Sequence, residues 1–216
     1  MEKIHLSQTL PHIFASLGRD TTTSDVWQQE LTLEKGKLYL IEASSGMGKS
    51  SLCSYLMGYR NDYEGKISFD GNDIRQFSTK DWVNIRRKHL SLLFQELRLF
   101  PELTAYENVE IKNRLTRWKT RKEIENWFEI LGIADKLDTQ VGKMSFGQQQ
   151  RVALMRALSQ PFDFLLVDEP ISHLDEENAR TVADLMLQET QRQGASIIST
   201  SIGKAVALPY NQTLHL

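Results

Sequence analysis

The stretch that decides the fold is KLYLIEASSGMGKSSLC, residues 37–53. Its beginning, KLYLI (37–41), is an apolar run of the length of a buried strand. A short loop of small residues follows, and a helix is expected from about Lys49 to Gly58. A buried strand that passes through such a loop into a helix predicts a parallel α/β sheet.

The loop itself, ASSGMGKS (43–50), matches the phosphate-binding pattern GxxxxGK[ST] at every fixed position except the first. Ala43 stands there instead of glycine, and its methyl group is tolerable if the backbone φ is negative. A solvated lysine at the end of a small-residue loop is the alternative interpretation. The strand before the loop and the helix after it argue for phosphate binding.

Such a loop binds anions because its backbone N–H groups point inward and the following helix N-terminus adds partial positive charge. Gly46 and Gly48 leave room for the backbone to approach the ligand. We expect Lys49 to reach the β- and γ-phosphates, as a catalytic residue, and Ser50 to ligate Mg²⁺. The expected phosphate contacts are Ser44, Ser45, Gly46, Met47, Gly48, Lys49, Ser50 and Ser51.

A second acidic motif ends another apolar run, FDFLLVDE (162–169). Asp168 and Glu169 fall where a parallel sheet presents ligands. We expect Asp168 to hold Mg²⁺, directly or through water, and Glu169 to act as general base toward an attacking water. The alternative is that the two carboxylates merely cap a helix that starts at Pro170.

The rest of the chain alternates strands and helices around one helical stretch. Further strands are expected at 66–71, where Asp-Gly predicts a hairpin turn, at 90–94 and 195–200, and in the final TLHL. Residues 98–143 are rich in helix formers and charge, and 176–193 also predict a helix. The expected class is α/β with right-handed crossovers and a helical insertion.

Composition excludes several classes of protein. The 216 residues carry 26 Lys and Arg against 28 Asp and Glu, a formal net charge of -2, which argues against a dedicated nucleic-acid binder. The single cysteine, Cys53, excludes an internal disulfide and is expected to be a packed thiol. We find neither a signal peptide nor a membrane-spanning run, so we expect a cytoplasmic protein that reaches a membrane only through a partner.

Four further motifs give the chain a specific resemblance. MSFGQQQRVALMRAL (144–158) resembles the signature and following helix of ATP-binding cassette (ABC) ATPases. Phe94-Gln95 resembles the Q-loop of that family, LFPELTAYENV (99–109) the entry to its helical subdomain, and SHLD (172–175) its D-loop. The match extends from about residue 24 to 216, and its wording is most similar to ATPases of the lipoprotein-release and macrolide-export type.

The resemblance implies a P-loop NTPase core with a parallel sheet, an N-terminal antiparallel β subdomain and an inserted α-helical subdomain. We expect a single ABC ATPase domain over 1–216, with a catalytic core lobe at 1–95 and 159–216. Residues 96–158 would form the helical subdomain that carries the signature.

The resemblance also implies a mechanism. Two cassettes, in a homodimer, would pack head to tail around ATP and Mg²⁺ and drive an integral-membrane permease, at the inner face of the membrane and without nucleic acid. Ser145 and Gly147 of one subunit, with Gln148, would bind the nucleotide held by the other. Gln95 would ligate Mg²⁺ and sense the nucleotide, and Asp175 would report one site to the other.

Three departures from the family concern the nucleotide site. Phe146 replaces a signature glycine, and its side chain either crowds the opposite phosphate or points away; backbone donors favour the second. No histidine occurs from 174 to 214, so the γ-phosphate histidine of the family is replaced by Ser201, or by Ile202 if the match shifts by one. Serine carries no positive charge, and losing one such contact costs about 10²–10³ in rate.

The third departure concerns the base. Residues 17–24, LGRDTTTS, lack the aromatic residue that stacks on adenine in the family. Trp27 and Phe14 are nearby, but each is expected to be a core residue. His173, in the D-loop, is expected to be ordinary loop variation.

Three functions therefore compete. The first is a transport ATPase. The second is a soluble ABC ATPase of DNA repair or translation, which would need a coiled-coil insertion or a second cassette that this chain lacks. The third is a regulatory cassette that binds ATP without efficient turnover, favoured by Ser201 and Phe146 and opposed by Glu169.

Overall fold

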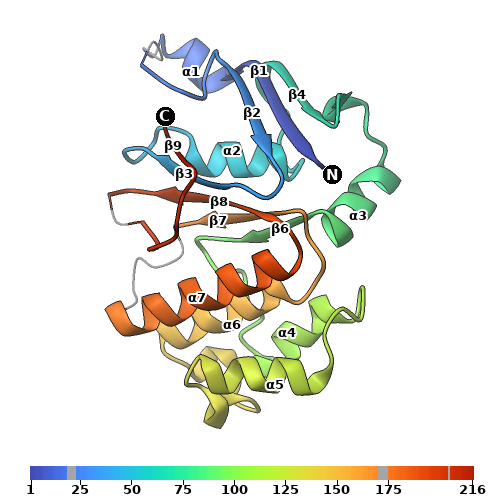
Figure 1. Ribbon diagram of the computed structural model, residues 1–216, viewed down its shortest axis with the longest axis vertical. Coiled ribbons are helices and arrows are strands. Elements are labelled where there is room, and N and C mark those ends of the chain that lie inside the picture. The colour runs from blue at the N-terminus through green and yellow to red at the C-terminus, as the bar shows by residue number, and fades with distance from the viewer. Residues whose placement is uncertain (19–22, 170–174, 204) are drawn as a thin grey trace.

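The computed structural model describes residues 1–18, 23–169, 175–203 and 205–216, and contains two sheets with helices between and below them (Figure 1). The parallel sheet has the strand order β6-β7-β8-β3-β9. Its strands are β3 (Leu38–Glu42), β6 (Leu90–Leu93), β7 (Phe164–Asp168), β8 (Ser196–Ser201) and β9 (Gln212–His215). Every residue of β7 is buried, as expected for a strand covered on both faces.

The antiparallel sheet has the order β2-β1-β4-β5. Its strands are β1 (Lys3–Pro11), β2 (Glu30–Glu34), β4 (Tyr63–Phe69) and β5 (Asn72–Asp73). The two-residue turn between β4 and β5 is Asp70-Gly71, with φ of 48° and 86°. Both positive angles fit the Asp-Gly hairpin signal in the sequence, so that prediction is confirmed.

One hydrophobic core fills the space between the two sheets. Helix α2 (Lys49–Leu56) lies there in Figure 1, beneath the antiparallel sheet and above the parallel one. The short α1 (His12–Ser16) follows β1, and α3 (Thr79–Lys88) precedes β6, with the 3₁₀ turn η1 (Ile74–Gln76) before it. Trp27 and Tyr55 are among the largest fully buried side chains of this core. Cys53 is buried in α2, which confirms the expected packed thiol.

A second core lies on the opposite face of the parallel sheet. Helices α6 (Phe146–Leu158) and α7 (Glu176–Arg192) cover that face, and α4 (Ala105–Asn113) and α5 (Arg121–Ile130) lie beyond them (Figure 1). The 3₁₀ turns η2 (Ala134–Lys136) and η3 (Val141–Lys143) connect α5 to α6. Capping boxes start four of the helices, at Ser78, Thr104, Thr120 and Ser145.

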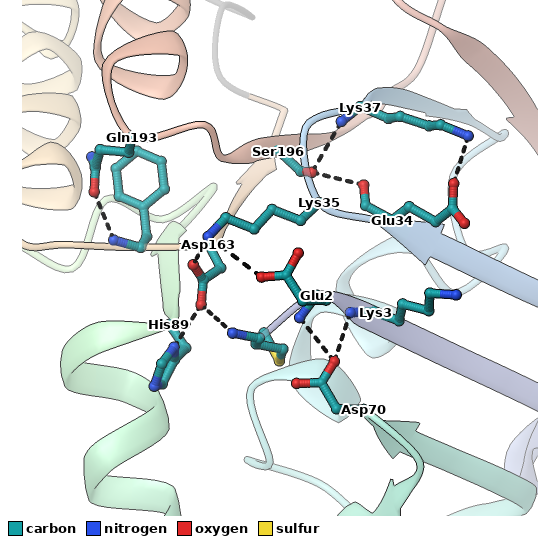
Figure 2. Close-up of polar contacts among 12 residues, drawn as sticks. Glu2, Lys3, Glu34, Lys35, Lys37, Asp70, His89, Asp163, Gln193 and Ser196 are labelled. Atoms are coloured by element: carbon teal, nitrogen blue, oxygen red, sulfur yellow. Dashed lines mark hydrogen bonds and ion pairs between the residues drawn. The ribbon is translucent and has the colours of Figure 1, made fainter.

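A charged cluster joins the two sheets at the end opposite the phosphate loop (Figure 2). Asp163, just before β7, accepts hydrogen bonds from Lys35 Nζ and, with His89 in the donor tautomer, from His89 Nδ1, each at 2.5 Å. Burial acts to raise the pKa of Asp163, but these bonds and that of the Met1 ammonium outweigh it, so the pKa lies below its ordinary value. The ionised carboxylate therefore ties the start of β7 to the loop between β2 and β3.

The α/β class, the parallel sheet, the antiparallel sheet and the helices of the 98–143 stretch are confirmed. The boundaries of the two subdomains, at 95/96 and 158/159, stay a prediction. Within the described residues, no helix combines the length and apolarity needed to cross a bilayer.

Candidate functional site

The phosphate loop opens onto a cavity of about 320 Å³ at the carboxyl end of β3. The loop contributes five lining residues, and the other segments contribute residues from α1, from the ends of β6 and β7 and from the end of β8. The lining residues are Ile13, Phe14, Ser45, Gly46, Gly48, Lys49, Ser50, Ser51, Gln95, Glu169 and Ile202. Segments far apart in the sequence thus meet at the loop, as the sheet topology predicts.

The loop is held open by packing behind it. Gly48 has φ of 93°, and a Cβ there would lie 3.0 Å from the Trp27 ring and 3.2 Å from Phe14. Trp27 is fully buried and its Nε1 donates a hydrogen bond to the carbonyl of Met47 at 3.1 Å. Trp27 therefore supports the loop from behind, which agrees with its expected place in the core.

Lys49 is the first residue of α2 and its side chain is only 5% exposed. Its Nζ donates to the carbonyls of Ala43 (2.9 Å) and Ser44 (3.0 Å), so the ammonium lies across the mouth of its own loop. The same Nζ lies 3.6 Å from Glu169 Oε1. Gln95 Nε2 donates to the other carboxylate oxygen of Glu169 at 3.1 Å. The structure thus joins Lys49, Glu169 and Gln95 in one polar chain at the cavity.

Glu169 holds an unusual backbone conformation. Its φ is 50°, in the left-handed region that non-glycine residues seldom occupy. It directly follows β7, so this turn leaves its side chain at the cavity beside Lys49 and Gln95. Strained backbone of this kind gathers at functional sites, where the surrounding structure holds it.

A smaller cavity of about 140 Å³ adjoins the first. Ser50, Gln95 and Asp168 all line it, so the three residues predicted to hold a metal meet in one place. Hydroxyl, amide and carboxylate oxygens are ligands that suit Mg²⁺, which also takes water and substrate phosphates. Asp168 is 6% exposed and accepts a hydrogen bond from Thr200 Oγ1 at 2.6 Å, which fixes the orientation of its carboxylate.

Cys53 also lines the smaller cavity. Burial, and after it the charge of Asp168, raises the pKa of this thiol well above its ordinary value. The thiol therefore stays protonated at neutral pH. Among the described residues there is no cluster of three or more His, Cys, Asp and Glu that could hold a metal ion.

Ser201 does not line either of the two cavities, and its role as a γ-phosphate contact stays a prediction. The residue is 1% exposed, at the end of β8, and its hydroxyl has no hydrogen-bond partner in the part of the chain that the structure describes. Ile202, the neighbouring candidate, is 49% exposed and lines the large cavity. An apolar side chain therefore faces the cavity at this point, because alternate strand residues point to opposite faces.

We call the α1 side of the cavity its base end, because the family resemblance expects the base contact near residues 17–24, directly after α1. Ile13 is 52% exposed and Phe14 is buried with its ring edge-on to Trp27, at 6.2 Å between centroids. Ile13 was missed by the sequence argument, which considered only aromatic side chains. The sequence carried no signal for it, because no hydrophobic period marks the five-residue helix α1.

The signature residues lie elsewhere in the chain. Ser145 is the N-cap of α6, where its hydroxyl accepts from Gln148 N (3.3 Å) and Gln148 Oε1 accepts from Ser145 N (3.0 Å). Neither these residues nor Gly147 lines either cavity. Phe146 is 44% exposed at the start of the helix. Within one chain, the structure does not bring the signature to the phosphate loop.

Asp175 is the N-cap of α7 and accepts from Asn178 N at 2.9 Å. Hydrogen bonds from Asn178, first from its backbone and then from its side chain, lower the pKa of Asp175. Asn178 Oδ1 accepts from Arg151 of α6 at 2.7 Å, so Asp175 is linked through Asn178 to the signature helix. Pro170, His173 and the rest of 170–174 lie outside the described residues.

Comparisons with known proteins agree with this geometry. A family model described as "ABC transporter" matches residues 27–172. The ABC transporter ATP-binding protein YtrE of Bacillus subtilis is 31% identical over 196 residues, 88% of this chain and 85% of that protein. The lipoprotein-releasing system ATP-binding protein LolD of Aquifex aeolicus is 35% identical over 191 residues, 86% of this chain and 84% of that protein.

Two further matches are with a longer sequence relative and with a solved structure. The macrolide export ATP-binding/permease protein MacB of Shewanella sp. (strain ANA-3) is 35% identical over 174 residues, which cover 78% of this chain and 26% of that protein. The dimeric structure of MJ0796, a bacterial ABC transporter cassette, superposes with a TM-score of 0.82 over 99% of this chain and 94% of that chain. Its sequence identity is 22%, so this likeness shows the fold.

Proposed function

Because this chain belongs to the ABC transporter family, we propose that it is the subunit that binds and hydrolyses ATP for a membrane transporter. The observation that carries the proposal is the polar chain of Lys49, Glu169 and Gln95 at the mouth of the phosphate loop. It places a cation, a carboxylate and an amide at one cavity, the set that phosphoryl transfer to water requires.

The triphosphate lies along the loop in this proposal. Backbone N–H groups of the residues from Ser44 to Ser51 surround its oxygens, and the N-terminus of α2 adds its partial charge. Lys49 then exchanges its two carbonyl partners and Glu169 for β- and γ-phosphate oxygens. Ser50, Gln95 and Asp168 would hold a Mg²⁺ ion, which would neutralise negative charge on the phosphates.

Glu169 acts as the general base. When Lys49 turns to the phosphates, one oxygen of Glu169 is released to accept the proton of the attacking water. Gln95 continues to hold the other oxygen and so orients the carboxylate. Ser201, expected from the sequence to contact the γ-phosphate, has a buried hydroxyl, and that contact stays a prediction.

A second copy of the chain completes the site. Ser145, Gly147 and Gln148 lie at the exposed N-terminus of α6, whose partial positive charge suits the γ-phosphate of a nucleotide bound by the twin subunit. To turn toward that phosphate, Ser145 Oγ gives up its bond to Gln148 N. The dimer thereby closes over ATP, and hydrolysis weakens it.

We further propose that the dimer drives an integral-membrane permease and lies at the cytoplasmic face of the membrane through that contact. The names of YtrE and LolD, ATP-binding proteins of a transporter and of a lipoprotein-releasing system, support this role. The regulatory alternative, a cassette that binds ATP with little turnover, is favoured by the apolar Ile202 at the cavity.

One experiment separates the two. ATP turnover is measured for the wild type and for Glu169→Gln, with Glu64→Gln on the exposed edge of β4 as the matched control. We expect Glu169→Gln to lose about 10²–10⁴ of the rate and to elute as an ATP-dependent dimer in size exclusion, whereas Glu64→Gln behaves as wild type. Wild-type turnover no faster than Glu169→Gln, even with a permease present, would establish the regulatory role.

A further inference from the structure

The connection from α4 to α5 concentrates positive charge. Its sequence, RLTRWKTRK (114–122), contains five Arg and Lys and no Asp or Glu. The whole chain has a formal net charge of -2, so this density of cations is local. We call residues 114–122 the basic loop.

One of the five cations holds the fold together, and the others face solvent. Lys119 is 1% exposed, and its Nζ lies 2.7 Å from Glu189 and 3.7 Å from Glu123. Those carboxylates explain why a buried ammonium is tolerated there. The four exposed cations are Arg114, Arg117, Arg121 and Lys122.

The chain leaves part of this exposed charge unneutralised. Arg114 and Arg121 each lie beside a glutamate one helical turn away, at 3.4 Å and 2.7 Å. Among the residues that the structure describes, no Asp or Glu lies at ion-pair distance from Arg117 or Lys122. The basic loop therefore keeps positive charge that an anionic ligand can pair with.

Two large apolar side chains project from between these cations. Leu115 is 48% exposed and Trp118 is 39% exposed. The other tryptophans, Trp27, Trp82 and Trp127, are buried or half-buried, so Trp118 is the most exposed of the four. Tryptophan and leucine among Lys and Arg is the composition of segments that lie in a membrane–water interface.

The basic loop is held in shape by hydrogen bonds at its two ends. Asn113 Oδ1 accepts from Lys119 N and Asn113 Nδ2 donates to the Lys119 carbonyl, each at 2.9 Å. Arg117 N donates to the Asn113 carbonyl at 2.6 Å, and the Arg87 guanidinium of α3 donates to the Leu115 carbonyl. Because the backbone is already fixed, binding through these side chains costs little ordering of the chain.

We propose that the basic loop binds anionic lipid headgroups directly, with Leu115 and Trp118 entering the boundary between headgroups and acyl chains. The inference goes beyond the proposed function, in which the chain reaches the membrane only through the permease. Each exposed Lys or Arg near an anionic membrane surface tightens binding by about fivefold. The two apolar side chains add burial that a neutral headgroup layer alone cannot attract strongly.

A single-stranded nucleic acid is the other polyanion to consider, because its bases could stack on Trp118. Leu115 offers no ring for a base to stack on, yet it is the more exposed of the two apolar side chains. An acyl boundary covers both side chains, so the lipid surface accounts for more of the loop.

The basic loop is separate from the nucleotide site. None of residues 114–122 lines either of the two cavities there. Lipid binding should therefore not require ATP, and substitutions in the loop should leave ATP turnover at the wild-type rate.

Flotation with vesicles tests the contact on the purified full chain, with no permease present. Vesicles of phosphatidylcholine mixed with phosphatidylglycerol supply an anionic surface, and phosphatidylcholine alone supplies a neutral one. We expect binding to the mixed vesicles that weakens as salt is raised, and at least about tenfold weaker binding to the neutral ones. No binding to the mixed vesicles, or equal binding to both, would overturn the proposal.

Charge reversal locates the contact on the loop. We expect the double variant Arg117→Glu with Lys122→Glu to bind mixed vesicles at least about tenfold more weakly than wild type. Lys66→Glu with Arg180→Glu, two exposed positions on β4 and α7, gives the same net charge and should bind as wild type. Equal losses in the two double variants would assign the attraction to net charge and overturn the proposal.

Fluorescence of Trp118 tests its entry into the boundary. We expect tryptophan emission to shift to the blue when mixed vesicles bind, and Trp118→Phe to bind them without that shift. Bound vesicles that leave the wild-type emission unchanged would overturn the insertion. Tighter binding to a single-stranded oligonucleotide than to mixed vesicles, lost in the Arg117→Glu and Lys122→Glu variant, would identify nucleic acid as the ligand instead.

The outcomes separate this inference from the proposed function. A chain that hydrolyses ATP but does not bind mixed vesicles would overturn the lipid contact alone. A chain that binds them through the basic loop but shows no ATP turnover would support the lipid contact and count against the proposed function.

Discussion

The two ends of the nucleotide cavity differ in the polarity of the side chains that line them. At the phosphate end, Lys49, Glu169 and Gln95 are joined by hydrogen bonds and an ion pair on the ends of buried strands. At the base end, Ile13 and Phe14 line the cavity from a helix of five residues and offer only apolar side chains. The difference indicates that the phosphates supply most of the affinity and that the base adds little selectivity.

Removing the Lys49 ammonium at the phosphate end should weaken ATP binding more than any substitution at the base end. Lys49→Ala takes away the cation that faces the β- and γ-phosphates and leaves Glu169 without its neighbour. We expect ATP binding to weaken by about 2–4 kcal/mol, roughly 30–1000-fold. Calorimetric titration checks this, with Lys66→Ala on the exposed face of β4 as control; unchanged affinity for Lys49→Ala would contradict the account.

A substitution that crowds the phosphate loop should cause the second-largest loss of affinity. Gly48→Ala adds a methyl group 3.0 Å from Trp27 at φ of 93°, so both strain and packing oppose it. We expect a loss of about 1–2 kcal/mol in affinity for ATP and for inorganic tripolyphosphate alike. Gly36→Ala separates the causes, since its φ is 85° and nothing lies within 4 Å of the added Cβ. If Gly36→Ala lowered tripolyphosphate affinity as much, the loop-specific explanation would be lost.

The apolar side chain of Ile202, which lines the cavity, can be replaced by a polar one. Ile202→His puts a hydrogen-bonding side chain on the cavity wall, and we expect turnover to rise by about tenfold, less than the roughly 10²–10³ of a preorganised contact because the new side chain is not held in place. Ser201→Ala should change nothing, because its hydroxyl is buried away from the cavity. Steady-state rates settle the point; a Ser201→Ala rate below a tenth of wild type would restore Ser201 as the contact residue.

A substitution at the base end should change ATP affinity least. Ile13→Tyr adds an aromatic ring where the base is expected, and stacking is worth about 1–3 kcal/mol per base. Because the site is half-exposed, we expect the lower limit, about fivefold tighter ATP binding. Tripolyphosphate affinity should stay the same, and Leu17→Tyr, on the exposed residue after α1, should affect neither ligand. Equal tightening of ATP and tripolyphosphate by Ile13→Tyr would contradict a base contact.

The phosphate end could be predicted from the sequence because the residues of each of its motifs are neighbours in the chain. The order of strand, loop and helix around Lys49 is continuous in the chain, and Asp168 and Glu169 directly follow an apolar run. Topology then brings the two motifs together, since parallel strands end at the same edge of the sheet. The strands of the parallel sheet, the hairpin at Asp70-Gly71 and the helices of 98–143 and 176–193 followed from hydrophobic period and turn chemistry for the same reason, whereas β1, β2, α1 and α3 were not predicted by range.

The base end could not be predicted in this way. Ile13 reaches the cavity from a short helix that no periodicity marks, and a shift of one residue decides whether Ser201 or Ile202 faces it. Contacts between distant segments depend on side-chain direction, which the sequence pattern does not fix.

The most direct test of the account is one calorimetric series on the wild type with Mg²⁺ and ATP, GTP or inorganic tripolyphosphate. Affinity concentrated at the phosphate end predicts dissociation constants for the three ligands within about tenfold of one another, or 1.4 kcal/mol. ATP binding more than about a hundredfold tighter than both other ligands would place the dominant contact at the base and contradict the account.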